Sequence, residues 1–168
     1  MKTIIIGLGN PILRDDSVGP RAVRLIKERL GREMPEGIGT DVKPDFKADD
    51  GADVKVSEIY AGGIRLLDEM SGYDRAFIID SIVTGETPGT IYRLTADDLP
   101  QSRNSGSIHD MTLPMALGMG RMLGMRLPEE ILIWAIEAKD VDSFGEELSE
   151  EVEKSLPLVV NSVLGSLS

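Results

Sequence analysis

Short apolar runs recur along this chain of 168 residues at intervals that suit buried β-strands. Each run is rich in Ile, Val or Leu, and turn-forming Gly, Pro or Asp residues lie beside it. A continuous apolar run bounded by turn residues is typical of a strand that is buried on both faces. The pattern predicts strands over residues 2–6, 54–59, 76–79, 90–94 and 131–136.

Helical periodicity fills the intervals between these runs. From Val18 to Leu30, apolar residues recur every three or four positions and share one helical face. Further helices are predicted over residues 64–70, 110–124 and 148–164, and Pro157 is expected to kink or split the last of them. Strands that alternate with helices predict an α/β sandwich with a mostly parallel sheet of about five strands.

Residues 31–52 interrupt this alternation. They are rich in Gly, Pro, Asp and Lys and have no clear hydrophobic period. We therefore expect a long loop or an insertion here, within a single domain that spans residues 1–168.

The composition narrows the class of protein. Apolar residues make up 41% and charged residues 28% of the chain, as in ordinary globular proteins. The formal net charge of −11 disfavours nucleic acid as a partner, because its phosphates would be repelled. The chain has no cysteine, and no apolar run approaches the length of a membrane span. We expect a cytoplasmic protein that binds neither membrane nor nucleic acid.

His109 is the single histidine of the chain. With one histidine and no cysteine, a His-Glu-x-x-His zinc site, a cysteine nucleophile and a cysteine-rich zinc site are all excluded. Any imidazole chemistry must use this residue, and the other candidate groups are carboxylates.

Carboxylates follow two of the predicted strands. Asp15 and Asp16 come after the turn that follows the first strand, and Asp80 closes the third. Ligands of parallel sheets bind beyond the carboxyl ends of the strands, so these groups and His109 are candidates for an oxygen-rich site for a divalent transition metal. Structural roles stay open as well. Asp15, Asp16 or Ser17 can cap the following helix, whereas Asp80 can serve a turn and His109 can be a structural hydrogen-bond partner.

Two further motifs have simpler interpretations. The run Gly7-Leu8-Gly9-Asn10-Pro11 is similar to the start of a dinucleotide fingerprint, but Ile12 stands where that fingerprint requires glycine. A tight turn from strand to loop is therefore favoured. The methionines at positions 111, 115, 119 and 122 share one helical face and are expected in the core, although part of this stripe also suits a groove for an apolar peptide.

Six short motifs occur in order along the chain. They are Gly7-Leu8-Gly9-Asn10, Arg14-Asp15-Asp16-Ser17-Val18-Gly19, Gly72-Tyr73-Asp74, Ile78-Ile79-Asp80, Pro88-Gly89-Thr90 and Ser107-Ile108-His109. This ordered set resembles the nickel-iron hydrogenase maturation endopeptidases. The resemblance extends from residue 1 to about residue 165, and residues 31–52 match least.

Members of that family remove a short C-terminal extension from the precursor of the hydrogenase large subunit once nickel has been inserted. The resemblance implies a twisted sheet flanked by helices, in agreement with a three-layer sandwich. It also implies that Asp16, Asp80 and His109 are the metal-binding set, with Asp16 a catalytic candidate too. The nickel is then carried by the substrate, no organic cofactor is needed, and the partner is the large-subunit precursor. The oligomeric state stays open, and a monomer is compatible with the sequence.

Several alternatives remain. The peptide bond can be hydrolysed through metal polarisation of the carbonyl or of water, or with Asp16 as a general base. Some family members carry Glu at this position, so the carboxylate here is retracted by one methylene. A non-enzymatic metal escort or assembly chaperone would use the same residues. Peptidyl-tRNA hydrolases open with a similar glycine run, but the residues that follow it here differ and the net charge argues against a tRNA ligand.

Overall fold

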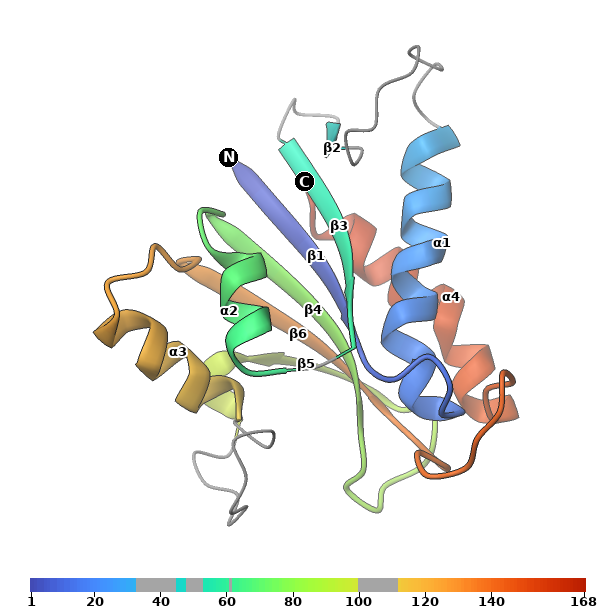
Figure 1. The fold of residues 1–168 in the computed structure, drawn as a ribbon. Helices are drawn as coiled ribbons and strands as arrows, with labels where there is room; N and C mark the ends of the chain where they lie inside the picture. The colour runs from blue at the N-terminus through green and yellow to red at the C-terminus, as the bar shows by residue number, and fades with distance from the viewer. Residues whose placement is uncertain (33–44, 48–52, 61, 100–111) are drawn as a thin grey trace.

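The computed structural model of the chain describes residues 1–32, 45–47, 53–60, 62–99 and 112–168 (Figure 1). Six strands and four α-helices lie in this part of the chain. The strands are β1 (Lys2–Leu8), β2 (Asp45–Lys47), β3 (Asp53–Ile59), β4 (Arg75–Ile82), β5 (Ile91–Thr95) and β6 (Glu130–Glu137). The helices are α1 (Val18–Arg32), α2 (Ile64–Met70), α3 (Leu113–Met122) and α4 (Glu150–Gly165), and the short 3-10 turns are η1 (Asp15–Ser17) and η2 (Ala96–Asp98).

The strands form one sheet in the order β2-β3-β1-β4-β6-β5. The four central strands are parallel, and β2 and β5 pair antiparallel with their neighbours at the two edges. From β1 the chain passes through α1 to β3 on one side, and it then returns through α2 to β4 on the other side of β1. The strand order therefore switches direction at β1 and β4. Open α/β sheets bind ligands at such a switch point, beyond the carboxyl ends of the strands.

Helices cover both faces of the sheet, with α1 and α4 on one face and α2 and α3 on the other (Figure 1). Successive residues of the central strands alternate between the two cores. Ile5 belongs to the core under α1 and α4, whereas Ile4 and Ile6 belong to the core under α2 and α3. This burial on both faces explains why the strands read as continuous apolar runs.

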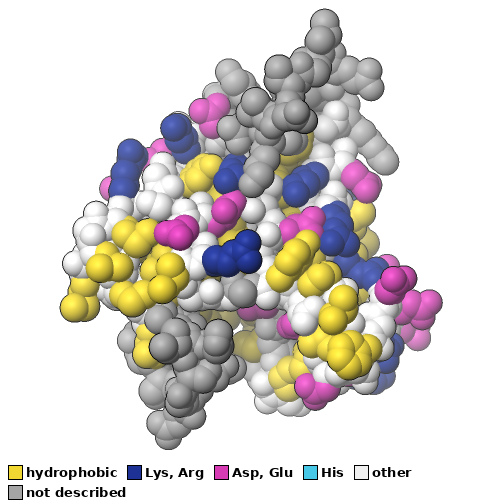
Figure 2. All heavy atoms as spheres, in the orientation of Figure 1, with side chains coloured by type: hydrophobic (Ala, Val, Ile, Leu, Met, Phe, Trp, Pro, Cys, Tyr) yellow, Lys and Arg dark blue, Asp and Glu magenta, His cyan; other side chains and the backbone are white. Residues whose placement is uncertain are grey.

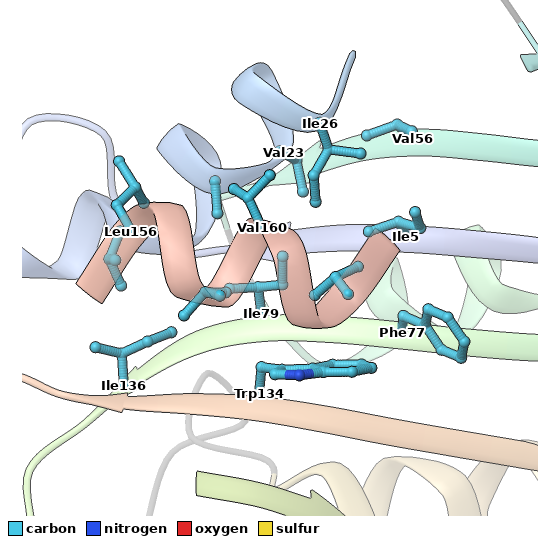
Figure 3. Packing of buried hydrophobic residues seen from close by; sticks show 14 of the residues in the cluster. Ile5, Val23, Ile26, Val56, Phe77, Ile79, Trp134, Ile136, Leu156 and Val160 are labelled. Carbon is cyan, nitrogen blue, oxygen red and sulfur yellow. The ribbon is translucent and has the colours of Figure 1, made fainter. Parts of the chain in front are cut away.

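The larger core lies between the sheet and the α1–α4 pair. Val23 of α1 and Val160 of α4 belong to this core together with Ile5 and Ile79 of the sheet (Figure 3). On the sheet, the rings of Phe77 and Trp134 meet edge to face with centroids 5.2 Å apart, and the Trp134 indole N–H donates to the Ser162 hydroxyl at 2.8 Å. These contacts fix β4 and β6 against α4.

The predicted α/β class, with a mostly parallel sheet flanked by helices, is confirmed. In the described part of the chain the sheet has six strands rather than about five, because residues 45–47 form β2 inside the segment that was expected to be a loop or insertion. Phe46 explains the extra strand: its buried side chain joins the core beside α1. A three-residue strand with one apolar anchor has no period that a sequence pattern can reveal. Residues 33–44 and 48–52 lie outside the described chain.

Two helices differ from their predictions. Pro157 does not split α4, which is a single helix from Glu150 to Gly165. Pro157 lies on the exposed side of that helix, where water can serve a carbonyl that lacks its usual donor, while the opposite side is held by the core. The described part of α3 begins at Leu113, after its N-cap Thr112. Across all the described ranges, no helix combines the length and the apolar character that crossing a membrane requires.

Candidate functional site

A cavity of about 750 Å³ opens at the switch point of the sheet, against the end of β1 and the middle and carboxyl-terminal parts of β4 and β6. Its apolar wall includes Leu8, Leu66 and Ile133, which come from two strands and α2. The polar side chains on the wall include Asp16 and Asp80. A cavity of this size accommodates a ligand as large as a short peptide segment.

Asp16 reaches the cavity because the chain turns sharply after β1. The backbone carbonyl oxygen of Asp16 lies only 1.9 Å from where a Cβ on Gly9 would stand, and Gly9 has a φ of +142°. Glycine is therefore required at this position, which confirms the interpretation of the glycine run as a tight turn. The Asn10 N–H donates to Asp16 Oδ2 at 2.9 Å, and the Ser81 hydroxyl donates to Asp16 Oδ1 at 2.8 Å.

Asp80 lies near the end of β4 and also lines the cavity. Its Oδ1 accepts the N–H of Ser81 at 2.8 Å. The structure thus brings Asp16 and Asp80 to one cavity, although all of α1, β2, β3 and α2 lies between them in the sequence. Both carboxylates are half-buried, so they face the cavity without being sealed from solvent.

His109, the third predicted ligand, lies outside the described residues. The described chain stops at Leu99 and resumes at Thr112, and both of these residues line the cavity. Within the ranges that the structure describes, no three His, Cys, Asp or Glu side chains are grouped so that they could hold a metal ion.

Asp15, next to Asp16, has a different role. Its side chain is fully buried and accepts hydrogen bonds from the backbone N–H groups of Lys139, Asp140 and Ser149 and from the Ser149 hydroxyl, at 2.7 to 2.8 Å. Burial raises the pKa of Asp15, but these hydrogen bonds, led by that from the Ser149 N–H, outweigh it and hold the pKa below its ordinary value. Asp15 therefore ties η1 to the start of α4.

The expectation that Asp15, Asp16 or Ser17 caps the following helix is wrong for all three. Asp15 binds the α4 side, Asp16 binds Asn10 and Ser81, and no side chain caps η1. The Ser17 hydroxyl instead donates to the carbonyl of Arg14 at 2.6 Å. Long-range partners outcompete local capping here, because the strand ends and the start of α4 converge on η1.

Glu137 is a buried carboxylate that the sequence reasoning missed. It ends β6, is 1% exposed, and accepts the hydroxyl and N–H of Thr84 at 2.7 and 2.8 Å and the N–H of Gly85 at 3.1 Å. Burial raises the pKa of Glu137, and the hydrogen bonds from Thr84, Gly85 and Glu86 lower it below the ordinary value. A charged residue directly after an apolar strand was the available signal. The contacts fix the loop after β4, next to the cavity residue Val83.

The methionine stripe on α3 is not a core face. Met115 and Met122 are 52% and 89% exposed, Met119 is partly buried, and Met111 lies outside the described chain. The buried face of α3 consists of Ala116, Leu117 and Gly120. Figure 2 shows hydrophobic side chains gathered on the surface over α3. Met115 and Met122 are among the exposed apolar side chains of this helix.

Fold and cavity define an α/β protein with two carboxylates at the switch point of a mostly parallel sheet. A family model described as hydrogenase maturation protease matches residues 45–166, and the chain belongs to that family. The resemblance seen in the sequence motifs is thereby confirmed.

Curated relatives carry corresponding names. The hydrogenase 2 maturation protease of Escherichia coli K12 is 25% identical over an alignment of 170 positions. The alignment covers 99% of this chain and 91% of the relative. The hydrogenase expression/formation protein HoxM of Azotobacter vinelandii is 25% identical over 155 residues, 91% of this chain. That match covers 66% of HoxM, so the chain spans about two thirds of the length of this relative.

Solved structures share the fold. The hydrogenase maturating endopeptidase HybD of E. coli superposes with a TM-score of 0.74 at 23% identity, over 99% of this chain and 92% of that one. The [NiFe] hydrogenase maturation protease HybD of Thermococcus kodakarensis superposes with a TM-score of 0.66 at 25% identity, over 100% of both chains.

Proposed function

We propose that this chain is an endopeptidase that removes the C-terminal extension of a nickel-iron hydrogenase large-subunit precursor after nickel insertion. The observation that carries the proposal is the meeting of Asp16 and Asp80, from η1 and β4, in one cavity at the switch point of the sheet. Membership of the hydrogenase maturation protease family supports the choice of substrate. Both carboxylates are only half-buried, so a peptide in the cavity has access to them.

The donor set fits nickel that is held by the substrate. Asp16 and Asp80 offer carboxylate oxygens, and His109 is proposed as the nitrogen ligand. Carboxylate and imidazole groups suit divalent first-row metals, and two or three ligands leave positions for groups of the precursor. A bound metal supplies Lewis-acid polarisation of the scissile carbonyl or of water.

The chain's own groups then handle the proton. As a general base, the Asp16 carboxylate takes a proton from a water molecule whose oxygen adds to the scissile carbonyl carbon. As the C–N bond breaks, the same proton passes to the leaving amine. The N–H of Asn10 and the hydroxyl of Ser81 hold the two oxygens of Asp16 and so fix the direction in which it accepts a proton.

An incomplete ligand set couples cleavage to correct assembly. A precursor without nickel offers these carboxylates nothing to bind, so it is held poorly and cleaved slowly. A nickel-loaded precursor brings the missing ligands with it.

The direct test incubates the purified chain with nickel-loaded and nickel-free precursor and follows the precursor mass by mass spectrometry. We expect the loaded precursor alone to lose the mass of its C-terminal peptide. His109→Ala and Asp16→Asn should each abolish this loss, and wild-type cleavage by both variants would contradict the site. An unchanged precursor mass with a stable complex would instead favour the non-enzymatic escort.

A second measurement addresses the metal alone. Titration of the free protein with Ni²⁺, Zn²⁺ or Cd²⁺ should give weak binding that disappears in Asp16→Asn and in His109→Ala. Binding that is unchanged in both variants would show that the metal is held elsewhere.

A further inference from the structure

Ser81 contacts both carboxylates of the cavity. Its backbone N–H donates to Asp80 Oδ1 at 2.8 Å, and its hydroxyl donates to Asp16 Oδ1 at 2.8 Å. An ionised carboxylate only accepts hydrogen bonds, so the serine must be the donor in both contacts. One residue thus links two acidic groups that are separated by 64 positions in the sequence, Asp16 and Asp80.

The strand geometry makes Ser81 the natural connector. Neighbouring residues of a strand point to opposite faces of the sheet. Ile78 belongs to the core under α2 and α3, and Ile79 belongs to the core under α1 and α4. By the same alternation Asp80 lies on the first face and Ser81 on the second, where η1 and α1 begin. The hydroxyl therefore meets Asp16 from the face that Asp80 does not occupy.

Both oxygens of Asp16 are held by uncharged donors, the Ser81 hydroxyl and the Asn10 N–H. Two such bonds restrict rotation of the carboxylate, and each oxygen retains a lone pair for another partner. No described lysine or arginine forms a salt bridge with Asp16, so within the described part of the chain these uncharged donors orient its carboxylate.

We propose that Ser81 is a positioning residue that holds Asp16 and Asp80 in a fixed relative orientation, so that both can engage one cation or one polarised carbonyl. The proposal rests on the function proposed above and assigns Ser81 no direct contact with substrate. Groups that orient metal-binding residues typically contribute about 10- to 100-fold to metal affinity or activity.

The sharpest test compares Ser81→Thr with Ser81→Val, two β-branched side chains of nearly equal shape that both suit a strand. The threonine variant keeps the hydroxyl and should cleave nickel-loaded precursor within about threefold of the wild-type rate. The valine variant should lose about 10- to 100-fold in kcat/KM, because a less well oriented Asp16 binds the metal of the precursor more weakly. Ser81→Ala should fall with the valine variant.

A matched control removes a similar bond elsewhere. The Ser57 hydroxyl of β3 donates to Glu69 Oε1 at 2.7 Å, and neither residue lines the cavity. Ser57→Ala should leave both kcat and KM unchanged. Titration of each free protein with Cd²⁺ provides a readout apart from cleavage, and we expect about 10-fold weaker binding for Ser81→Val but wild-type binding for Ser57→Ala.

The outcomes separate this inference from the proposed function. Equal kcat/KM and equal Cd²⁺ affinity for the threonine and valine variants would overturn the role of Ser81, and loss of activity in Asp16→Asn would then leave the proposed function standing. Failure of the wild-type chain to cleave the nickel-loaded precursor would overturn the proposed function itself. If the valine variant does not fold, Ser81→Ala takes its place in the same comparison with threonine.

Discussion

Asp15 and Asp16 are neighbours in the chain, yet they serve two different regions of the molecule. Asp15 is fully buried and accepts four hydrogen bonds from Lys139, Asp140 and Ser149, so its acceptor capacity is spent on joining η1 to α4. Asp16 is half-buried, accepts two hydrogen bonds from described residues and lines the cavity. The comparison teaches that the hydrogen-bond partners of a carboxylate, and not its place in a motif, separate a structural role from a chemical one.

The local backbone explains why the side chains of Asp15 and Asp16 point in different directions. Both residues belong to η1, a 3-10 turn with about three residues per turn, so successive side chains point about 120° apart. One side chain therefore faces the start of α4, and the next faces the ends of β1 and β4. In a β-strand, neighbouring side chains would also point in different directions. The 3-10 turn in addition keeps both side chains at the carboxyl edge of the sheet.

The largest effect is expected from exchanging each carboxyl for its amide. Asp16→Asn should lower the rate of precursor cleavage by about 1,000-fold, because the amide neither accepts a proton nor binds a cation well. Its unfolding temperature should stay close to that of the wild type. Asp15→Asn, assayed below its unfolding temperature, should retain most of the cleavage activity. Reversed outcomes for the two variants would break the comparison.

Removing the Asp15 side chain should mainly reduce stability. Asp15→Ala leaves the donors of Lys139, Asp140 and Ser149 without their acceptor, and we expect a loss of about 3 kcal/mol in the free energy of unfolding. Urea denaturation followed by circular dichroism measures this loss. Asp16→Ala is the matched control, with an expected cost of about 1 kcal/mol. Equal losses in the two variants would contradict the structural role of Asp15.

Acid should reduce the stabilisation that the buried carboxylates of Asp15 and Glu137 give to the fold. Hydrogen bonds hold the pKa of Asp15 below its ordinary 3.8 and that of Glu137 below its ordinary 4.5. A lowered pKa in the folded state stabilises the fold above the unfolded-state pKa, and this contribution is lost as the pH falls through the folded-state pKa. The free energy of unfolding should therefore decline below about pH 4.5. Asp15→Asn and Glu137→Gln should each make the decline shallower, and an unchanged slope in both would refute the assignment.

The smallest effect concerns the rim of the cavity. Val83 lines the cavity and is 60% exposed, so Val83→Ser should raise KM for the precursor by about fivefold, equivalent to roughly 1 kcal/mol, without affecting stability. Leu158 on α4 is 61% exposed and does not line the cavity, so Leu158→Ser is the control and should leave KM unchanged. Equal KM values for Val83→Ser and Leu158→Ser would show that the rim at Val83 does not contribute to binding of the precursor.

Sequence patterns predicted the features that depend on residues close together in the chain. The strands of the parallel core and the positions of Asp16 and Asp80 at strand ends followed from apolar runs and turn residues. The roles of Ser81 and Glu137 depend on contacts across 65 and 53 positions, and no periodicity encodes such pairings. The capping prediction failed for the same reason, because Asp15 finds its partners at Lys139 to Ser149 rather than in the next helix.

The bond between Asp15 and α4 has a consequence for motion. A segment opens independently only where few buried contacts hold it, and Asp15 ties η1 to a helix that is packed into the largest core. Asp16 follows Asp15 directly in η1, so we expect it to move with the slow fluctuations of the core and not with the faster ones of a surface loop. If the cavity changes shape when a substrate enters, we therefore expect the change in the substrate or in the other walls of the cavity. Asp16 should keep its position.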